Sequence, residues 1–532
     1  MQFIRSPFHA GSLRDSMPPA GYVVILGALG SWAAFNGILF ALDSAKRYRA
    51  EAAWFLFTAA LIITAVVAVR KGIQRDTTVV APTSLSVTLV GAAVAIVSAL
   101  LLYYPALSIG LLSDDFVLLS RAKQGVLAEL SWEYLRPLPL ALWRLLATGV
   151  EASDIPWRLH AFSIALHGVN AALVAALAAR LGLARLEAWI AGALFLVFPG
   201  AVEPVVWASG IFDITVVLFM LAACVAVATT HGVTQVVIAA VLTTAALASK
   251  EVGVVLPILL AITAWVSPHS TLRQARVAVA ASFAIVGTYV LIRVIGGFAT
   301  APPLASVSGY VVKEMLSRPF GFLGLPFHSQ LLATVPWLVL AFALWWPAVL
   351  VGSAISWWTN ARNARLVLAL GLWVVVTVAP LGTMLFVSDD LQGSRYLYAG
   401  AAAWAVITVA VVRWLPNRLS IVLTGVLVVG FLIVVRAHLS PWLAAAAERD
   451  RVLTLFRQAN LDCTPTDVVG LPDHIRGAYV LRNGFVEAAT TDSPAGSGEP
   501  CMIEFGNDAF HKVEPSSPGA AGGVGPTGLR PR

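Results

Sequence analysis

Long apolar runs separated by short polar segments fill most of the chain between Gly21 and Val435. Each run has about 18 to 25 residues, which lets an α-helix cross a hydrocarbon core about 30 Å thick. The pattern therefore predicts thirteen transmembrane helices, at 21–41, 52–69, 85–109, 157–179, 187–206, 210–229, 233–248, 252–267, 276–297, 331–356, 366–387, 397–412 and 419–436.

Composition supports a membrane protein. Of 532 residues, 59% are hydrophobic and only 12% are charged, which is more apolar surface than a water-soluble fold can bury. We predict an all-α polytopic membrane protein. Arg5 and Arg14 precede the first apolar run, but no short apolar core followed by a cleavage site is present, so this first helix is expected to remain.

Basic and acidic residues fall on opposite sides of the predicted helices. With a cytoplasmic N-terminus, the inner loops would carry Arg70, Lys71, Arg75, Arg180, Arg185, Arg273, Arg276, Arg362, Arg365, Arg413 and Arg418. Loop 42–51 is the exception, because its three basic residues would lie outside. The expected location is the cell inner (plasma) membrane. The net charge of +7 is explained by membrane anchoring and needs no nucleic-acid partner.

The chain divides into four predicted parts. These are an N-terminal pair of helices in 1–84, a transmembrane core in 85–436, a small extracytoplasmic C-terminal α/β domain in 437–515, and a disordered, Gly- and Pro-rich tail in 516–532. Outer segments 110–156 and 298–330 are expected to contain interfacial helices.

The C-terminal domain is expected to begin with a helix from Trp442 to Arg457 and to continue with short strands near Gly477 and Met502. It also holds Cys463 and Cys501. An extracytoplasmic location would permit a disulfide between these two cysteines, and the sequence leaves the pairing open.

Asp114 and Asp115 follow directly after a predicted helix, at the membrane surface. Adjacent carboxylates at that depth need solvent, a partner or a bound cation. One of them can act as a general base, or the pair can bind a divalent cation such as Mg²⁺ or Mn²⁺. The alternative is that they only end the helix.

Three basic residues are candidate phosphate ligands at the same outer surface: Arg136, Lys250 and Arg395. A guanidinium can bind a phosphate through two parallel hydrogen bonds, and an ammonium can bind it as a point charge. Simpler readings exist for each. Arg136 and Arg395 can extend towards lipid headgroups, and Lys250 can pair with its neighbour Glu251.

Glu203, Asp213 and Tyr396 are further candidate site residues. The two carboxylates interrupt apolar sequence, so each must face a cavity or a partner. Pairing with a basic residue to hold the bundle together is the alternative. His160 and His167 share one helix face, where hydrogen bonding between helices is favoured over metal binding because no third ligand is evident.

The order of these motifs resembles the membrane-embedded GT-C glycosyltransferases, and most closely the branch of transmembrane and tetratricopeptide-repeat O-mannosyltransferases. The resemblance covers about 85 to 412. It rests on Ser113-Asp-Asp-Phe, Tyr134-Leu-Arg-Pro-Leu, Trp157 with His160 and His167, Phe198-Pro with Glu203, Trp207 and Asp213, Leu247-Ala-Ser-Lys-Glu, and Ser394-Arg-Tyr-Leu-Tyr.

This resemblance implies an inverting hexosyltransferase that takes a sugar from a polyprenyl-phosphate donor. Asp114 would be the catalytic base, supported by Asp115. Arg136, Lys250 and Arg395 would bind the donor phosphate. The sugar or acceptor site would be lined by Glu203, Asp213 and Tyr396. The acceptor, a protein, lipid or polysaccharide of the cell envelope, stays open because no repeat array follows the core.

Two other classes of function are considered. A transporter or flippase of a lipid-linked sugar would place ionisable groups at mid-membrane and often has related halves, whereas here the carboxylates gather on one side. An inert assembly partner would use its C-terminal domain to recruit proteins. An Asp114→Asn variant distinguishes an enzyme, which would lose turnover, from a scaffold, which would keep its function.

Overall fold

The structure of the protein is a computed structural model that describes residues 85–124, 135–295, 361–378, 390–413, 417–459, 461, 463–491 and 499–513. The predicted helices at 21–41, 52–69 and 331–356 lie outside these residues. So do the outer segment 298–330 and the tail 516–532.

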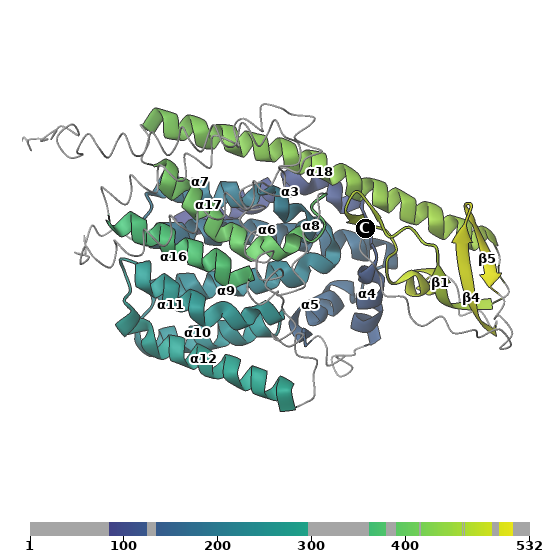
Figure 1. Cartoon of the computed structure of the whole chain (residues 1–532), viewed down its shortest axis with the longest axis horizontal. Helices are drawn as coiled ribbons and strands as arrows, with labels where there is room; N and C mark the ends of the chain where they lie inside the picture. The colour runs from purple at the N-terminus through teal and green to yellow at the C-terminus, as the bar shows by residue number, and fades with distance from the viewer. Residues whose placement is uncertain are drawn as a thin grey trace, which may run out of the picture.

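Helices make up most of the described chain (Figure 1). They are α3 (Leu85–Tyr103), α4 (Asp114–Gln124), α5 (Pro137–Ala147), α6 (Ile155–Arg180), α7 (Arg185–Leu196), α8 (Val202–Val206), α9 (Ile211–Thr229), α10 (Gly232–Leu247), α11 (Leu256–Val266), α12 (Leu272–Ile295), α16 (Ala361–Val378), α17 (Tyr398–Val412), α18 (Asn417–Ala459) and α19 (Phe485–Thr491). Short 3₁₀ turns connect several of them.

Six described helical segments are long and apolar enough to cross a membrane: Leu89–Ser108, Ala152–Arg180, Ala208–Thr229, Leu272–Ile295, Ser394–Val412 and Thr424–Ala459. A bent pair, α7 with Pro199–Val206, would make seven. The predicted count of thirteen is not supported. Helices α10, α11 and α16 overlap predicted spans, but the apolar part of each is only 10 to 17 residues long within the described residues.

Helix α6 lies at the centre of the bundle and packs against α3, α7 and α9. Small residues permit this packing. A Cβ added at Gly168 of α6 would lie 2.6 Å from the Cα of Ile96 in α3, and one at Gly192 of α7 would lie 2.7 Å from the Ala171 carbonyl oxygen. Membrane helices that approach this closely need glycine or alanine at the contact.

The predicted span 187–206 is broken. Helix α7 ends before Phe198-Pro199, and the chain turns by 53° into the segment that contains α8. Proline cannot donate the backbone hydrogen bond that a continuing helix requires, and it also restricts the residue before it. This break places Glu203 in the bundle interior, where it is 2% exposed.

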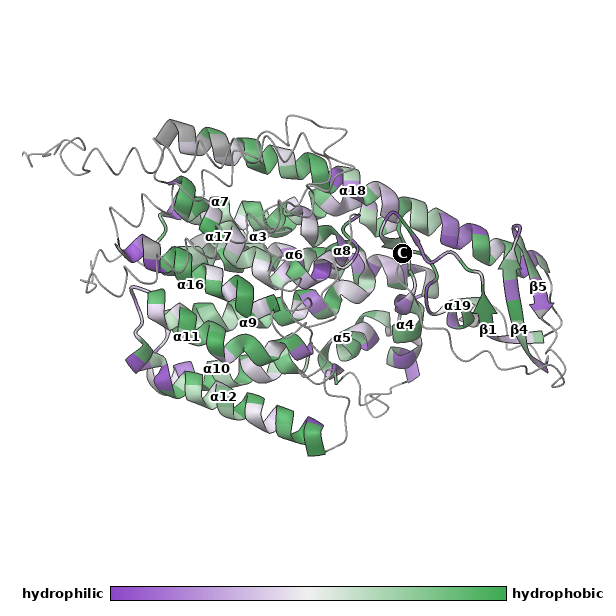
Figure 2. Ribbon diagram, viewed as in Figure 1, coloured by the Kyte–Doolittle hydropathy of each residue, from purple (hydrophilic) through white to green (hydrophobic). Residues whose placement is uncertain are grey.

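Polar residues gather towards the ends of the helices, whose middle parts are mostly apolar (Figure 2). At the end predicted to be cytoplasmic, Arg413 Nε lies 3.8 Å from Glu187 Oε1. The Arg362 guanidinium lies against Gly182, in the connection between α6 and α7. Two of the predicted inner residues, Arg362 and Arg413, therefore lie at this end of the bundle, and the candidate site described below lies at the other.

The C-terminal domain begins within a helix and not after one. Helix α18 runs for 43 residues from the last predicted span through the predicted Trp442–Arg457 segment, with Pro441 inside it. The predicted helices 419–436 and Trp442–Arg457 therefore belong to one continuous helix. Helix formers such as Leu443 and the four alanines after it continue the helix.

Beyond α18 lies a small sheet (Figure 1). Strand β1 (Cys463–Val469) pairs in parallel with β4 (Glu499–Gly506), which pairs antiparallel with β5 (Ala509–Val513). The two-residue strands β2 (His474–Ile475) and β3 (Ala478–Tyr479) form a separate hairpin. The structure joins Cys463 to Cys501 by a disulfide, which links β1 to β4.

Candidate active site

Asp114 and Asp115 have different environments at the start of α4. Asp115 is fully buried, and its two carboxylate oxygens accept hydrogen bonds from the backbone N–H groups of Leu112 and Ser209, both 2.8 Å long, and from the Ser209 hydroxyl. Burial raises the pKa of Asp115 to about 7, against the opposing effect of these hydrogen bonds. Asp115 therefore holds the loop, and Asp114 is the carboxylate that solvent can reach.

Asp114 is partly exposed and receives a hydrogen bond on one oxygen. The Asn483 amide of the C-terminal domain donates to Asp114 Oδ1 over 2.5 Å. Among the described residues, Asp114 Oδ2 accepts no hydrogen bond. This oxygen has the lone pairs that a general base needs.

The loop before Asp114 is fixed by two residues from distant helices. Arg449 of α18 donates through Nη1 to the carbonyl oxygens of Ile109 (2.9 Å) and Leu111 (2.6 Å). His160 Nε2 of α6 lies 2.8 Å from the Gly110 carbonyl oxygen. The carbonyl groups of a buried loop need such partners, so this arrangement sets the position of the acidic pair.

A second set of charged groups lies among the ends of α5, α8, α9, α10 and α12 and the turn before α17. We call it the charge cluster, and it comprises Arg136, Glu203, Asp213, Lys250, Glu251, Arg293 and Arg395. Of the eight residues singled out from the sequence, five belong to the cluster, and a sixth, Tyr396, packs against it. The other two are Asp114 and Asp115.

Lys250 pairs with Asp213 and not with its neighbour Glu251. Its Nζ lies 2.5 Å from Asp213 Oδ1, and both side chains are 9% exposed. Burial lowers the pKa of Lys250, as do Arg136 and Arg395 nearby, while Asp213 raises it. Glu251 instead faces Arg136.

Arg136 binds Glu251 through two nitrogens. Its Nη2 lies 2.7 Å from Oε2 and its Nε donates to both oxygens at 3.1 Å. Arg293 Nη1 of α12 lies 3.7 Å from the other oxygen of the same carboxylate. One carboxylate is thus shared by two guanidinium groups.

Arg395 is a mostly buried guanidinium of the cluster, with its side chain 18% exposed. It forms an ion pair with Glu203 and donates through Nη1 to the Tyr479 hydroxyl over 2.9 Å. The aromatic rings of Trp207 and Tyr396 lie 5.0 and 4.8 Å from its central carbon. Since the Lys250 ammonium lies 5.5 Å from the same Tyr396 ring, this ring connects the two cations.

The cluster has more cations than carboxylates. Its four basic groups (Arg136, Lys250, Arg293, Arg395) face three acidic ones (Glu203, Asp213, Glu251), a formal excess of one positive charge among the described residues. Removing so many charges from water costs several kcal/mol for each ion unless partners compensate. Such a group in a membrane protein indicates a functional site.

Trp207 connects the acidic loop to the charge cluster. Its indole N–H donates to the Leu112 carbonyl oxygen over 3.2 Å, while its ring stacks near Arg395. Trp207 therefore contacts both the loop before Asp114 and the Arg395 guanidinium. Within the described part of the chain, Asp114 makes no ion pair with a cation of the cluster.

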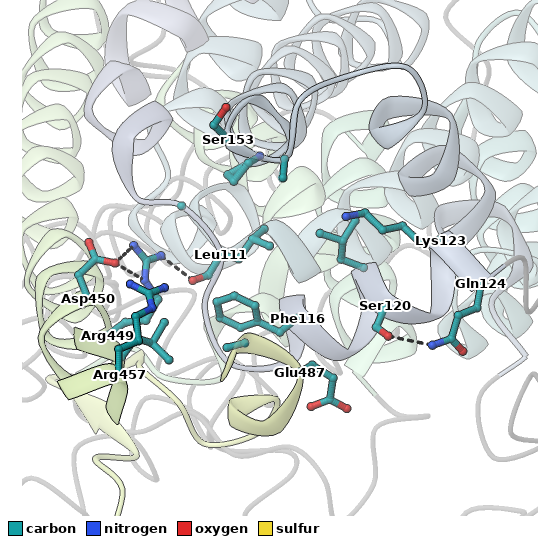
Figure 3. Close-up of a pocket in the computed structure, with 16 residues that line it drawn as sticks. Leu111, Phe116, Ser120, Lys123, Gln124, Ser153, Arg449, Asp450, Arg457 and Glu487 are labelled. Carbon is teal, nitrogen blue, oxygen red and sulfur yellow. Dashed lines mark hydrogen bonds and ion pairs between the residues drawn. The ribbon is translucent and has the colours of Figure 1, made fainter. Parts of the chain in front are cut away.

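A cleft of about 730 Å³ opens beside α4, lined by Phe116, Ser120 and Lys123 together with α18 and the start of α19 (Figure 3). Successive helix residues are rotated by about 100°, so Phe116, Ser120 and Lys123 lie on the side of α4 opposite to Asp114. The lining of the cleft includes neither Asp114 nor a member of the charge cluster.

His167 forms hydrogen bonds between helices, as predicted, whereas His160 bonds to the carbonyl group of Gly110 in a loop. His167 Nδ1 lies 2.7 Å from the Tyr398 hydroxyl of α17, and its Nε2 lies 3.0 Å from the Leu196 carbonyl oxygen of α7. No group of three or more His, Cys, Asp or Glu side chains within the described ranges is arranged to bind a metal ion. Metal binding by Asp114 and Asp115 stays an untested prediction.

Sequence reasoning missed three members of the site. Arg293 interrupts an apolar span, and that signal could have identified it. Tyr479 and Asn483 belong to a polar domain in which tyrosine and asparagine are unremarkable, so no sequence signal points to them.

Compared with known protein families and with curated proteins, the chain matches no family model and no curated sequence.

Proposed function

We propose that the protein is a membrane glycosyltransferase that transfers a sugar from a polyprenyl-phosphate donor to an extracytoplasmic acceptor with inversion. The observation that carries the proposal is the charge cluster, a largely buried group of basic and acidic side chains that Trp207 connects to the loop before an accessible carboxylate. The motif order that resembles GT-C glycosyltransferases supports the same reading.

The donor fits the cluster by charge and by depth. A prenyl tail holds its phosphate at the membrane interface, and the cluster lies where several apolar helices end. A phosphate could take the place of a carboxylate beside Lys250 or Arg395, because both groups offer oxygens to the same nitrogen donors. Glu203 and Asp213 would then be released to bind sugar hydroxyls, which need acceptors.

The reaction is a single displacement. Asp114 Oδ2 takes the proton from an acceptor hydroxyl as the hydroxyl oxygen bonds to the anomeric carbon of the sugar. The bond from that carbon to the phosphate oxygen breaks, and both its electrons leave with the polyprenyl phosphate. Lys250, Arg395 and Arg136 stabilise the negative charge that grows on the leaving phosphate.

We further propose the finer topology. The site and the C-terminal domain would face the outside of the inner (plasma) membrane, with the basic end near Arg413 in the cytoplasm, because basic residues are retained on that side. The core would extend over 85–436 and N-terminal helices would precede it, which adds to the six or seven crossings of the described chain.

The test compares cells that lack the protein with cells that produce the wild type, Asp114→Asn or Asp467→Asn. Asp467 is an exposed carboxylate in the C-terminal domain and serves as the matched control. Mass spectrometry of envelope glycans, glycolipids and glycoproteins should show one sugar missing from the deletion and from Asp114→Asn cells, and present in the other two. If the protein were a flippase or a scaffold, deletion cells would also lack the sugar product, but Asp114→Asn cells would still contain it.

A further inference from the structure

A short segment of the C-terminal domain, Tyr479–Gly484, touches both halves of the candidate active site. We call it the docking segment. It lies more than 360 positions along the chain from the acidic loop, with a separation of 369 between Asn483 and Asp114. Residues that far apart in the sequence come into contact only through the tertiary fold.

The first half of the docking segment enters the charge cluster. Tyr479 is 4% exposed, accepts a hydrogen bond from Arg395 and lies within 3.4 Å of Glu203 Oε1 through its hydroxyl oxygen. Its ring lies 4.6 Å from that of Trp207. Tyr479 therefore contacts the Arg395 guanidinium, which the rings of Trp207 and Tyr396 also enclose.

The second half of the docking segment covers the acidic loop. The Ser113 backbone N–H donates to the Val480 carbonyl oxygen over 3.0 Å, and the Asn483 backbone N–H donates to the Ser113 hydroxyl over 3.3 Å. The Asn483 side chain then donates to Asp114 Oδ1 over 2.5 Å. Three hydrogen bonds thus align the two segments.

Gly484 permits this close approach. Its φ is +78°, and a Cβ there would lie 2.6 Å from the Ser113 carbonyl oxygen. A residue with a side chain would be strained in this conformation and would push the two backbones apart. The contact therefore depends on glycine at this position.

We propose that the docking segment completes the active site, with Asn483 as the positioning residue for Asp114 and Tyr479 as the positioning residue for Arg395. Asn483 occupies one oxygen of the carboxylate and fixes its rotation, so that Oδ2 is presented to the hydroxyl of the acceptor. The C-terminal domain is thereby a part of the enzyme and not an appendage. This inference rests on the proposed transferase function.

The test uses full-length protein in membranes of producing cells, with Asn483→Ala, Asn483→Asp and Lys512→Ala. Lys512 is an exposed residue of β5 in the same domain and serves as the control. Two quantities are measured: the amount of the sugar product that the deletion removes, and binding of a sugar-free polyprenyl phosphate to the purified protein. Asn483→Ala should lower product at least tenfold and leave binding of this probe within twofold of wild type.

The Asn483→Asp variant adds a pH dependence of product formation, which would not be seen if Asn483 had only a structural role. Two adjacent carboxyl groups share a proton as the pH falls, and the protonated partner can again donate to its neighbour. Product relative to wild type should therefore be higher at about pH 6 than at about pH 8 for this variant. Asn483→Ala should show no such recovery.

Outcomes separate this inference from the function on which it rests. If Asp114→Asn abolishes product while Asn483→Ala leaves it unchanged or raises it, the transferase stands and the positioning role is overturned. If deletion and Asp114→Asn change no glycan, the function itself fails. A loss of probe binding in Asn483→Ala equal to its loss of product would also overturn the positioning role, because the variant would then have disturbed the whole site.

Discussion

Lys250 Nζ and Asp213 Oδ1 lie 2.5 Å apart at a place where both side chains are 9% exposed. A buried pair of this kind adds little net stability, because loss of hydration offsets most of the attraction. Removing one partner is a different matter, since the other charge is left buried and alone. The pair is thus a sensitive point at which structural and functional roles can be separated.

We expect Lys250→Met to destabilise the protein by about 3 to 5 kcal/mol, because the Asp213 carboxylate loses its partner. The double variant Lys250→Met with Asp213→Leu should recover most of that loss in a thermal unfolding measurement. It should not recover the sugar product, because a phosphate ligand is gone. Recovery of both would mean that the pair only holds the bundle together.

Arg395→Lys keeps the charge but loses the planar fork that reaches Glu203, Tyr479 and the surrounding rings. Binding of sugar-free polyprenyl phosphate in nanodiscs should weaken about tenfold, as expected when a two-point guanidinium contact becomes a single ammonium contact. Arg413→Lys at the opposite end of the bundle is the control and should bind normally. Equal affinities for both variants would remove Arg395 from the phosphate site.

Gly110→Ala should destabilise the acidic loop. Gly110 has a φ of +74°, and a Cβ there would lie 2.6 Å from Arg449 Nη1, so the substitution combines backbone strain with displacement of the guanidinium that holds the loop. The matched control is Gly149→Ala, with a φ of +70° and no atom within 4 Å of the added Cβ. We expect Gly149→Ala to lose about 1 kcal/mol and Gly110→Ala at least about 2 kcal/mol more, with product lost only in the latter. Equal melting temperatures would show that Arg449 moves aside freely.

Removing the disulfide with Cys463→Ser and Cys501→Ser should destabilise the C-terminal domain. The bond closes a loop of 38 positions, for which the chain-entropy model gives about 4 kcal/mol. Limited proteolysis should then cut 463–513 before the helical bundle unfolds. Cys224→Ala, which removes the buried free cysteine, should not alter this cleavage. Resistance equal to wild type would mean that the sheet and the contacts with α4 hold the domain without the bond.

Asp115 should make stability depend on pH. Burial raises the pKa of Asp115 to about 7 in the folded protein, above that of an aspartate in the unfolded chain. The contribution of Asp115 to the free energy of unfolding is therefore full below about pH 4 and is lost as the pH rises through about 7. The total change is about 4 kcal/mol. The melting temperature of detergent-solubilised protein should therefore fall between about pH 5 and pH 8.

The Asp115→Asn variant should melt at a lower temperature than the wild type at every pH, because its amide would place an NH₂ group against an N–H donor. Its melting temperature should also fall less than that of the wild type between about pH 5 and pH 8. Asp467→Asn should keep the wild-type dependence. A wild-type melting temperature that rises over this range would contradict the buried, proton-binding environment.

Sequence reasoning singled out five of the seven residues of the charge cluster but not how they pair. Glu203, Asp213 and Lys250 stood out because ionisable groups in apolar sequence need partners. Chain neighbours suggested pairing of Lys250 with Glu251, yet the 3₁₀ turn that begins at Glu251 directs this carboxylate to Arg136. Pairing depends on side-chain direction, which hydropathy does not contain.

Helix lengths and long-range docking were the least predictable features. Span 187–206 reads as one apolar run, but Pro199 divides it, and the last span continues without a break into the C-terminal domain. The contact of Asn483 with Asp114 leaves no periodic trace in the sequence, because one hydrogen bond between distant loops requires only two residues to meet. The disulfide, in contrast, needed only an oxidising compartment and two cysteines in one small domain.

The most direct test is a cryo-electron microscopy structure of the protein in a nanodisc with a sugar-free polyprenyl phosphate. The account predicts phosphate density within hydrogen-bonding distance of both the Lys250 ammonium and the Arg395 guanidinium, with the prenyl tail directed into the membrane. A phosphate bound elsewhere, with Lys250 still paired to Asp213 and Arg395 still paired to Glu203, would contradict it.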